Sequence, residues 1–191
     1  MFQSDGAIGK TSLLISFSSG GFPRDYQPTV FDNFSSLCTF NGKTFTLGLF
    51  DTAGQEDFDR LRPLGYTSTD VFLICYSVVN PPSYQNVLDK WYVELMTHTA
   101  KIPIVLVGTQ NDLRTDKETL DLLTLKQQSP ITYEQGMMMR KKIQAKAFTE
   151  CSVLSQKGVK QVFECAIKAY LENQSDIIKD KKKQQENCII L

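Results

Sequence analysis

The chain begins with residues 1–12, MFQSDGAIGKTS, and this stretch contains a glycine-rich sequence that leads into lysine and threonine. In a phosphate-binding loop, glycines let the backbone approach a phosphate chain, and the N–H groups at the start of a helix point at it. The lysine then reaches the outer phosphates, and the threonine hydroxyl binds Mg²⁺. A glycine-rich turn that only caps a helix has a similar sequence, so the rest of the chain must decide between the two interpretations.

The composition is typical of a globular protein with one domain. The chain has 191 residues, of which 41% are hydrophobic and 22% are charged. Lysine plus arginine equals aspartate plus glutamate at 21 each, so no excess of positive charge favours nucleic acid as a partner. Scattered cysteines favour reduced thiols over disulfides or zinc, and they lie at positions 38, 75, 151, 165 and 188. With no apolar leader and no run of transmembrane length, we expect a cytoplasmic protein.

Several short stretches predict strands. Asn41-Gly42 lies between two β-rich stretches and predicts a tight hairpin. Dense apolar runs predict buried strands at residues 71–78, 102–108 and 147–152.

Helical spacing of apolar residues alternates with these strands. It occurs after Pro81, over residues 131–146 with Thr132 as N-cap, and after Val159. The alternation predicts an α/β fold over residues 1–174, with an open, mostly parallel sheet and helices on both faces. We also predict a charged extra helix near residues 116–128 and a flexible, lysine-containing tail over residues 175–191.

Three more segments place polar residues at the ends of predicted strands. Asp51 can hold Mg²⁺ through water, and Gln55 can orient an attacking water. Asp112 can accept two hydrogen bonds from guanine, and adenine presents no such pair of donors. Residues 150–153 can bring backbone amides to the guanine oxygen. Ligands bind at the carboxyl ends of strands in open α/β sheets, so the four segments together predict a guanine-nucleotide site.

These motifs resemble those of small GTPases of the Ras superfamily, and the chain is similar to the Rho family, close to its Rac branch. The resemblance runs from Ser4 to the C-terminus and includes YQPTVFDNF, LGLFDTAGQEDFDRLRPLGY, GTQNDLR and ECSVLSQKG. It implies the P-loop NTPase fold of a small G domain, with residues 116–128 as the Rho-type insert. It also implies a molecular switch that binds GTP with Mg²⁺ and hydrolyses it to GDP.

The resemblance assigns a role to individual residues of this chain. The implied nucleotide-binding residues are Asp5, Gly6, Ala7, Ile8, Gly9, Lys10, Thr11, Ser12, Phe22, Tyr26, Thr29, Gly54, Thr109, Gln110, Asp112, Ser152 and Val153. Mg²⁺ would be held by Thr11, Thr29 and, through water, Asp51, and Gln55 would be catalytic. The effector region would consist of Tyr26, Thr29, Val30, Phe31, Asp32, Asn33 and Phe34. The γ-phosphate would order this first switch and a second one over residues 51–66.

The resemblance implies several partners: exchange factors, GTPase-activating proteins, a dissociation inhibitor and effectors, with the actin cytoskeleton as the process controlled. No arginine lies in the switches where it would act in cis, so we expect slow hydrolysis that an activating protein's arginine accelerates. The chain ends Cys188-Ile189-Ile190-Leu191, a prenylation box whose final leucine favours geranylgeranyl on Cys188. Together with nearby lysines, it predicts reversible attachment to the cytoplasmic face of the plasma membrane.

The start of the chain leaves three alternatives open. A typical strand has about five or six residues, so residues 1–3 are too few for the central first strand, which we expect to be largely missing. Ser4 stands where the loop normally has glycine, and at a positive φ it would cost about 1–2 kcal/mol. The chain is therefore a GTP-hydrolysing switch, an interaction protein that binds nucleotide poorly, or a switch whose true start lies upstream.

Overall fold

The protein has an α/β fold built on a parallel sheet. The computed structural model describes residues 1–21, 31–52, 62–99 and 102–187. The sheet contains, in this order, β1 (Phe2–Gln3), β4 (Phe72–Ser77), β5 (Ile104–Thr109) and β6 (Ala147–Glu150). All neighbouring pairs are parallel, and every residue of β4 and β5 is buried, as expected for strands covered on both faces. These strands lie where the apolar runs predicted them.

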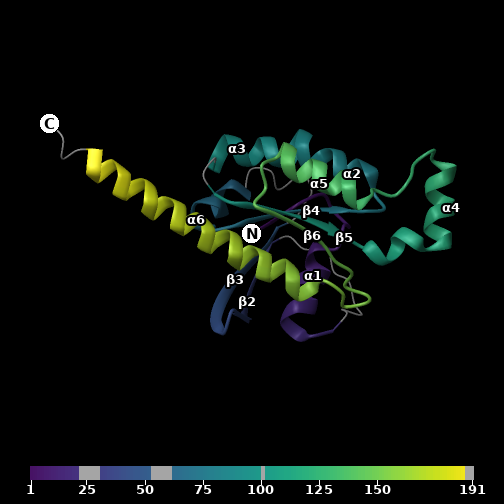
Figure 1. Ribbon diagram of the computed structural model, residues 1–191. Helices are drawn as coiled ribbons and strands as arrows, with labels where there is room; N and C mark the ends of the chain where they lie inside the picture. Colours follow the sequence, from purple (N-terminus) through teal and green to yellow (C-terminus); the bar gives the residue numbers. More distant parts are fainter. Residues whose placement is uncertain (22–30, 53–61, 100–101, 188–191) are drawn as a thin grey trace.

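Helices cover both faces of this sheet (Figure 1). One face carries α1 (Lys10–Ser19) and α6 (Val159–Asn187), and the other carries α2 (Pro81–Asn86), η3 (Val87–Tyr92), α3 (Val93–Thr99) and α5 (Tyr133–Lys142). Each face has its own apolar core, with Phe163 in the first and Trp91 in the second. Gly136 allows α5 to pack closely on the sheet, because a Cβ there would lie 2.2 Å from the Phe148 ring.

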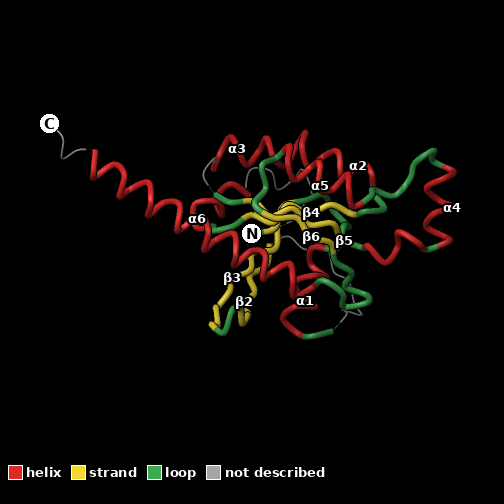
Figure 2. Tube along the Cα trace, in the orientation of Figure 1, coloured by secondary structure: helices red, strands yellow, loops and turns green. Residues whose placement is uncertain are grey.

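The hairpin forms as predicted but stands apart from the parallel sheet. β2 (Phe31–Phe40) and β3 (Lys43–Thr52) are antiparallel, and Asn41 and Gly42 between them have φ values of 49° and 74°. Both values lie in the left-handed region that a two-residue hairpin turn requires. In the described chain β3 pairs only with β2, so the strands form two separate sheets (Figure 2). The cause is the length of β1, which has only two residues, as the sequence led us to expect.

The helix expected near residues 116–128 is present and projects from the domain. This helix is α4 (Lys117–Leu125), which follows the short η4 (Asn111–Thr115), and Asp116 caps α4 by accepting a hydrogen bond of 2.9 Å from the Thr119 N–H. Thr132 likewise caps α5 in a capping box with Gln135.

The structure differs from our expectation after Gln174, where we predicted a flexible tail. α6 continues to Asn187 as one helix of 29 residues and extends away from the domain (Figure 1). Its polar end is rich in lysine and glutamine, which are good helix formers, and it continues from turns that are already packed on the sheet. Extending an existing helix avoids the cost of nucleation. Within the described residues, no helix is both long and apolar enough to cross a membrane.

The amino terminus completes the short first strand. The Met1 ammonium donates a hydrogen bond of 2.9 Å to the Val71 carbonyl, and the Leu73 N–H donates one of 2.9 Å to the Met1 carbonyl. Both bonds continue the parallel pairing of β1 with β4. Burial lowers the pKa of this amine from 8.0 to about 5, because a charged group is poorly solvated there, although Asp70 opposes the shift.

In protein produced with Met1 as its free amino terminus, stability should depend on pH through this amine. Between pH 8 and about 5 the unfolded chain takes up a proton that the folded chain does not bind, so the free energy of unfolding should fall as the pH falls through this window. The total loss should be on the order of 4 kcal/mol, and none should be added below about pH 5.

Urea unfolding of the nucleotide-free protein at several pH values between 5 and 8.5 measures this effect. The matched control is the same chain acetylated at Met1, which carries no ammonium and should lack this part of the pH dependence. Equal pH dependence in the two forms would contradict the prediction.

Candidate functional site

The glycine-rich loop leads from β1 into α1, as the sequence predicted. Gly9 is the N-cap of α1 with φ 92°, a left-handed conformation that favours glycine, and the Leu13 N–H donates to the Gly9 carbonyl at 2.9 Å. Ala7 also has a positive φ, of 60°. No acidic side chain lies in the first turn of α1, so the partial positive charge of the helix start is not neutralised there. The arrangement suits an anion such as a phosphate.

Lys10 lies back across this loop rather than in solvent. Its Nζ donates hydrogen bonds to the carbonyls of Ser4 (2.9 Å) and Asp5 (2.7 Å) and to the Ser4 hydroxyl (2.5 Å). Burial lowers the pKa of Lys10 from 10.5 to about 8, against the opposing effect of nearby acidic groups that include Asp51.

Ser4 does not strain the loop. It is absent from the positive-φ residues of the described chain, so the backbone cost that we considered from the sequence does not arise. The hydroxyl has a role instead: it accepts from Lys10 and donates to the Asp5 carbonyl at 3.0 Å. Ser4 thus gives the Lys10 ammonium an oxygen ligand that glycine could not provide.

Asp5 ties the loop to the helices on the opposite face of the sheet from α1. One carboxylate oxygen accepts a hydrogen bond of 2.9 Å from the Trp91 Nε1–H, and the other accepts one of 2.8 Å from the Asn86 Nδ2–H. These bonds satisfy the carboxylate from α2 and η3, and they fix the backbone on which Gly6 follows. The sequence did not indicate either donor, since Trp91 fits the apolar spacing of the helix expected after Pro81.

Two of the predicted Mg²⁺ ligands lie together. The Thr11 Oγ1–H donates to the Asp51 Oδ2 at 2.6 Å, although the two residues are 40 positions apart in the chain. Thr11 lies in the first turn of α1 and Asp51 near the end of β3, where it is fully buried. A hydroxyl and a carboxylate are oxygen ligands of the kind that Mg²⁺ prefers.

The residues expected to bind the base lie beyond β5. Thr109 ends that strand, and its hydroxyl lies 2.6 Å from the Ile8 carbonyl and 3.0 Å from the Tyr76 carbonyl, so it joins the glycine-rich loop to the sheet. Gln110 follows with φ 58°, and its side-chain oxygen accepts a hydrogen bond from the Ser77 hydroxyl. Asp112 lies next in η4.

A second loop is fixed close to these residues. Asn111 donates its N–H to the Cys151 carbonyl at 3.2 Å, which joins the start of η4 to the residue after β6. Ser152 is fully buried, and its hydroxyl accepts a hydrogen bond of 3.0 Å from the Ser155 N–H, so it braces the loop as predicted. Gln156 donates to the Val153 carbonyl and exchanges hydrogen bonds with Ser16 of α1.

An ion pair supports the base-binding side. Arg114 in η4 forms two hydrogen bonds, of 2.6 and 2.8 Å, with the two carboxylate oxygens of Glu150 in β6. It also donates to the Ile131 carbonyl. A bidentate pair of this kind fixes direction as well as distance. Sequence reasoning did not identify it, because the two residues are 36 positions apart.

The structure describes only some of the predicted site residues. The loop over residues 5–12, Thr109, Gln110, Asp112, Ser152 and Val153 all follow the carboxyl ends of parallel strands, and Asp51 joins them from β3. Of the effector region, Phe31, Asp32, Asn33 and Phe34 begin β2. The remaining predicted residues lie outside the described ranges: Phe22, Tyr26, Thr29, Val30, Gly54 and Gln55. Their roles stay predictions.

The geometry and the comparisons identify the class of protein. The family model described as "Ras family" matches residues 2–172, so the chain belongs to the Ras family. The chain is also 71% identical over 188 residues to the Rho-related protein racL of Dictyostelium discoideum, in a match that covers 98% of this chain and 95% of that protein. It is thus a Rho/Rac-like small GTPase, which binds GTP and hydrolyses it.

The Ser4 hydroxyl should weaken nucleotide binding, because it holds the ammonium that a phosphate oxygen would otherwise attract. In Ser4→Ala the carbonyl contacts of Lys10 remain and only the hydroxyl is lost. We expect the affinity for GDP to rise about three- to tenfold, the net effect of one typical hydrogen bond of about 0.5–1.5 kcal/mol.

The measurement is the equilibrium affinity and dissociation rate of a fluorescent GDP. Ser18→Ala is the matched control, since the Ser18 hydroxyl bonds only to backbone carbonyls within α1. Weaker GDP binding by Ser4→Ala would show that the hydroxyl supports the loop instead of competing with the nucleotide.

Proposed function

We propose that this small GTPase acts in Rho/Rac-type signalling, as a switch that binds effector proteins when it carries GTP. The proposal is supported chiefly by the contact between Thr11 and Asp51 at 2.6 Å, which joins the phosphate loop to the start of the proposed second switch. Loss of the γ-phosphate would alter both the phosphate loop and the start of the second switch, because one hydrogen bond connects these two segments. Control of the actin cytoskeleton is proposed from the family alone.

We further propose Mg²⁺ as the cofactor. Thr11 and Asp51 fit it by chemistry and by position, with Asp51 acting through water and Thr29 adding a third oxygen. When bound, Mg²⁺ would neutralise charge on the β- and γ-phosphates. Lys10 would donate to the same phosphate oxygens, and the N–H groups of residues 6–11 would surround them.

Hydrolysis is proposed to rest on Gln55, which would orient the attacking water. The described residues supply binding and orientation, and no arginine of this chain is assigned to the transition state. We therefore propose that an activating protein supplies the arginine and accelerates hydrolysis on the order of 10³–10⁵-fold.

Guanine selection by Asp112 provides the direct test of the nucleotide site. Asp112→Asn replaces an acceptor of two hydrogen bonds with a group that has one acceptor and one donor. GDP affinity should fall about 100-fold or more, whereas xanthosine diphosphate, which presents a carbonyl where guanine has its amine, should bind more tightly than to the unaltered protein.

Competition between the two nucleotides for the purified protein measures this change. Asp116→Asn is the matched control, because it is the same substitution four positions later at a carboxylate that caps α4. If Asp112→Asn kept the preference of the unaltered protein for GDP, the proposed base contact would be wrong.

We also propose that geranylgeranyl on Cys188 attaches the protein to the cytoplasmic face of the plasma membrane. A single lipid chain gives marginal binding, and lysines at positions 179, 181, 182 and 183 would add about 1 kcal/mol each near an anionic surface. Asp180 and Glu186 reduce this attraction. The attachment is therefore proposed to be reversible and sensitive to salt.

Fractionation of cells that express the tagged protein tests the attachment. Cys188→Ser should move most of the protein from the membrane fraction to the soluble one. Cys165→Ser, a change at a half-buried cysteine on α6, should leave the distribution unchanged. Persistent membrane binding of Cys188→Ser would exclude a prenyl anchor.

A further inference from the structure

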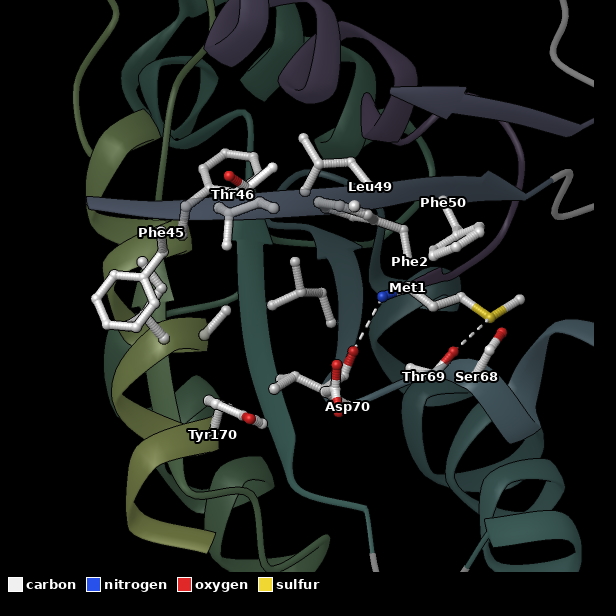
Figure 3. Close-up of a pocket in the computed structure, with 17 residues that line it drawn as sticks. Met1, Phe2, Phe45, Thr46, Leu49, Phe50, Ser68, Thr69, Asp70 and Tyr170 are labelled. Atoms are coloured by element: carbon white, nitrogen blue, oxygen red, sulfur yellow. Dashed lines mark hydrogen bonds between the residues drawn. The ribbon is translucent and has the colours of Figure 1, made fainter. Parts of the chain in front are cut away.

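Gln3 is an uncharged polar residue in the interior of the fold. It lies in β1 opposite Ile74 of β4 and is only 1% exposed. Successive side chains of a strand point to opposite faces, and Phe2 lies in the same apolar core as Leu49 of β3 (Figure 3). Gln3 therefore points to the other face, where its Nε2–H donates a hydrogen bond of 3.0 Å to the buried hydroxyl of Tyr66.

The neighbours of this amide fix its orientation. Tyr66 lies in η2 (Arg62–Ser68) and donates its hydroxyl hydrogen to Glu94 of α3, whose carboxylate can only accept. Burial, together with this bond to Glu94, raises the pKa of Tyr66, so the hydroxyl keeps its hydrogen. The hydroxyl must then accept from the Gln3 nitrogen, and the Gln3 Oε1 is turned away. That oxygen is buried and finds no hydrogen-bond donor among the described residues.

A half-satisfied amide is a poor choice for stability alone. A buried polar atom without a partner costs free energy, and an apolar side chain of similar size would avoid this cost. Sequences break such local rules mainly at functional or strained sites. The hydrogen bond from Gln3 joins the strand before the phosphate loop to η2, which contains the end of the proposed second switch.

A second set of contacts links η2 to the same loop. Arg62 forms hydrogen bonds of 3.3 Å with both carboxylate oxygens of Glu94, and its guanidinium carbon lies 5.0 Å from the centre of the Trp91 ring. The indole of Trp91 in turn donates to Asp5. Because these contacts also hold η2, loss of the Gln3 amide should displace this element without unfolding it.

We propose that Gln3 is a positioning residue for GTP hydrolysis, whose side-chain amide sets the place of η2 relative to the phosphate loop through Tyr66. At the other end of the proposed second switch, Asp51 is bonded to Thr11. A displaced η2 would slow hydrolysis, since a small misplacement of a reacting group is costly. This consequence rests on the proposed role of Gln55, which lies between the two ends.

The substitution Gln3→Met tests the proposal, because it keeps the length of the side chain and removes both polar atoms. Hydrolysis of preloaded GTP in a single turnover, without an activating protein, should slow about three- to tenfold, the effect of one lost hydrogen bond. The affinity for GDP and the midpoint of urea unfolding should not fall, since the unpaired Oε1 is also removed. Gln85→Met is the matched control, at an exposed glutamine that bonds to Asp89 on the surface of the domain.

Two further measurements locate the effect at the proposed hydrogen bond. In a Tyr66→Phe background, Gln3→Met should cause no additional slowing, because the accepting hydroxyl is already absent. In GDP-loaded protein, the amides of residues 62–68 should exchange hydrogen faster in Gln3→Met than in the unaltered chain. Gln3→Leu serves for the same measurements if Gln3→Met does not fold.

An unchanged rate of hydrolysis in the folded variant would overturn the proposal. A fall in GDP affinity or in stability that matches the fall in rate would also overturn it, because it would indicate a general structural role for Gln3. Additional slowing in the Tyr66→Phe background would show that the amide acts elsewhere. Normal hydrolysis by Gln55→Ala would instead refute the proposed role of Gln55, while the exchange at residues 62–68 and the rate of Gln3→Met would still decide the role of Gln3.

Discussion

The pairing of the first three residues with β4 is the interaction on which the nucleotide site depends. Two main-chain hydrogen bonds at Met1 and the short ladder of Phe2 and Gln3 hold the chain at the edge of the four-stranded sheet. The glycine-rich loop begins immediately afterwards, so its position is set by this contact. The side chain of Gln3 adds a hydrogen bond of 3.0 Å to the Tyr66 hydroxyl, which connects the strand to η2 (Arg62–Ser68).

Other contacts also position the loop. Asp5 is held by Trp91 and Asn86 from one face of the sheet, and the Ile8 carbonyl accepts a hydrogen bond from Thr109 at the end of β5. Lys10 then joins the two ends of the loop through the carbonyls of Ser4 and Asp5. Side chains that are remote in the sequence thus position the loop together with the backbone of β1.

Most of the fold could be predicted because its signals are local. Asn41-Gly42 has the turn chemistry of a hairpin, and the dense apolar runs of β4 and β5 report burial on both faces directly. The continuation of α6 past Gln174 could not be predicted from polarity, since a polar segment forms a helix when an existing one is extended into it.

The candidate site likewise contains some features that the sequence predicted and others that it did not. The phosphate loop and the pairing of Thr11 with Asp51 followed from residue types at the ends of strands. The partners of Asp5 did not, because an indole N–H in an amphipathic helix leaves no trace in the apolar spacing. The effect of Ser4 depended on its φ value and on the place of the Lys10 ammonium, and neither is a property of the sequence pattern.

The continuous course of α6 would have a mechanical consequence for the proposed attachment through Cys188. A helix is a stiff spacer, so a lipid on Cys188 would hold the domain at a fixed distance and within a limited range of tilts, instead of letting it rotate freely on a loose tether. The same helix packs against the sheet through Phe163 and Ile167. Any force on the proposed anchor would then be transmitted along one continuous helix to the apolar core on this face of the sheet.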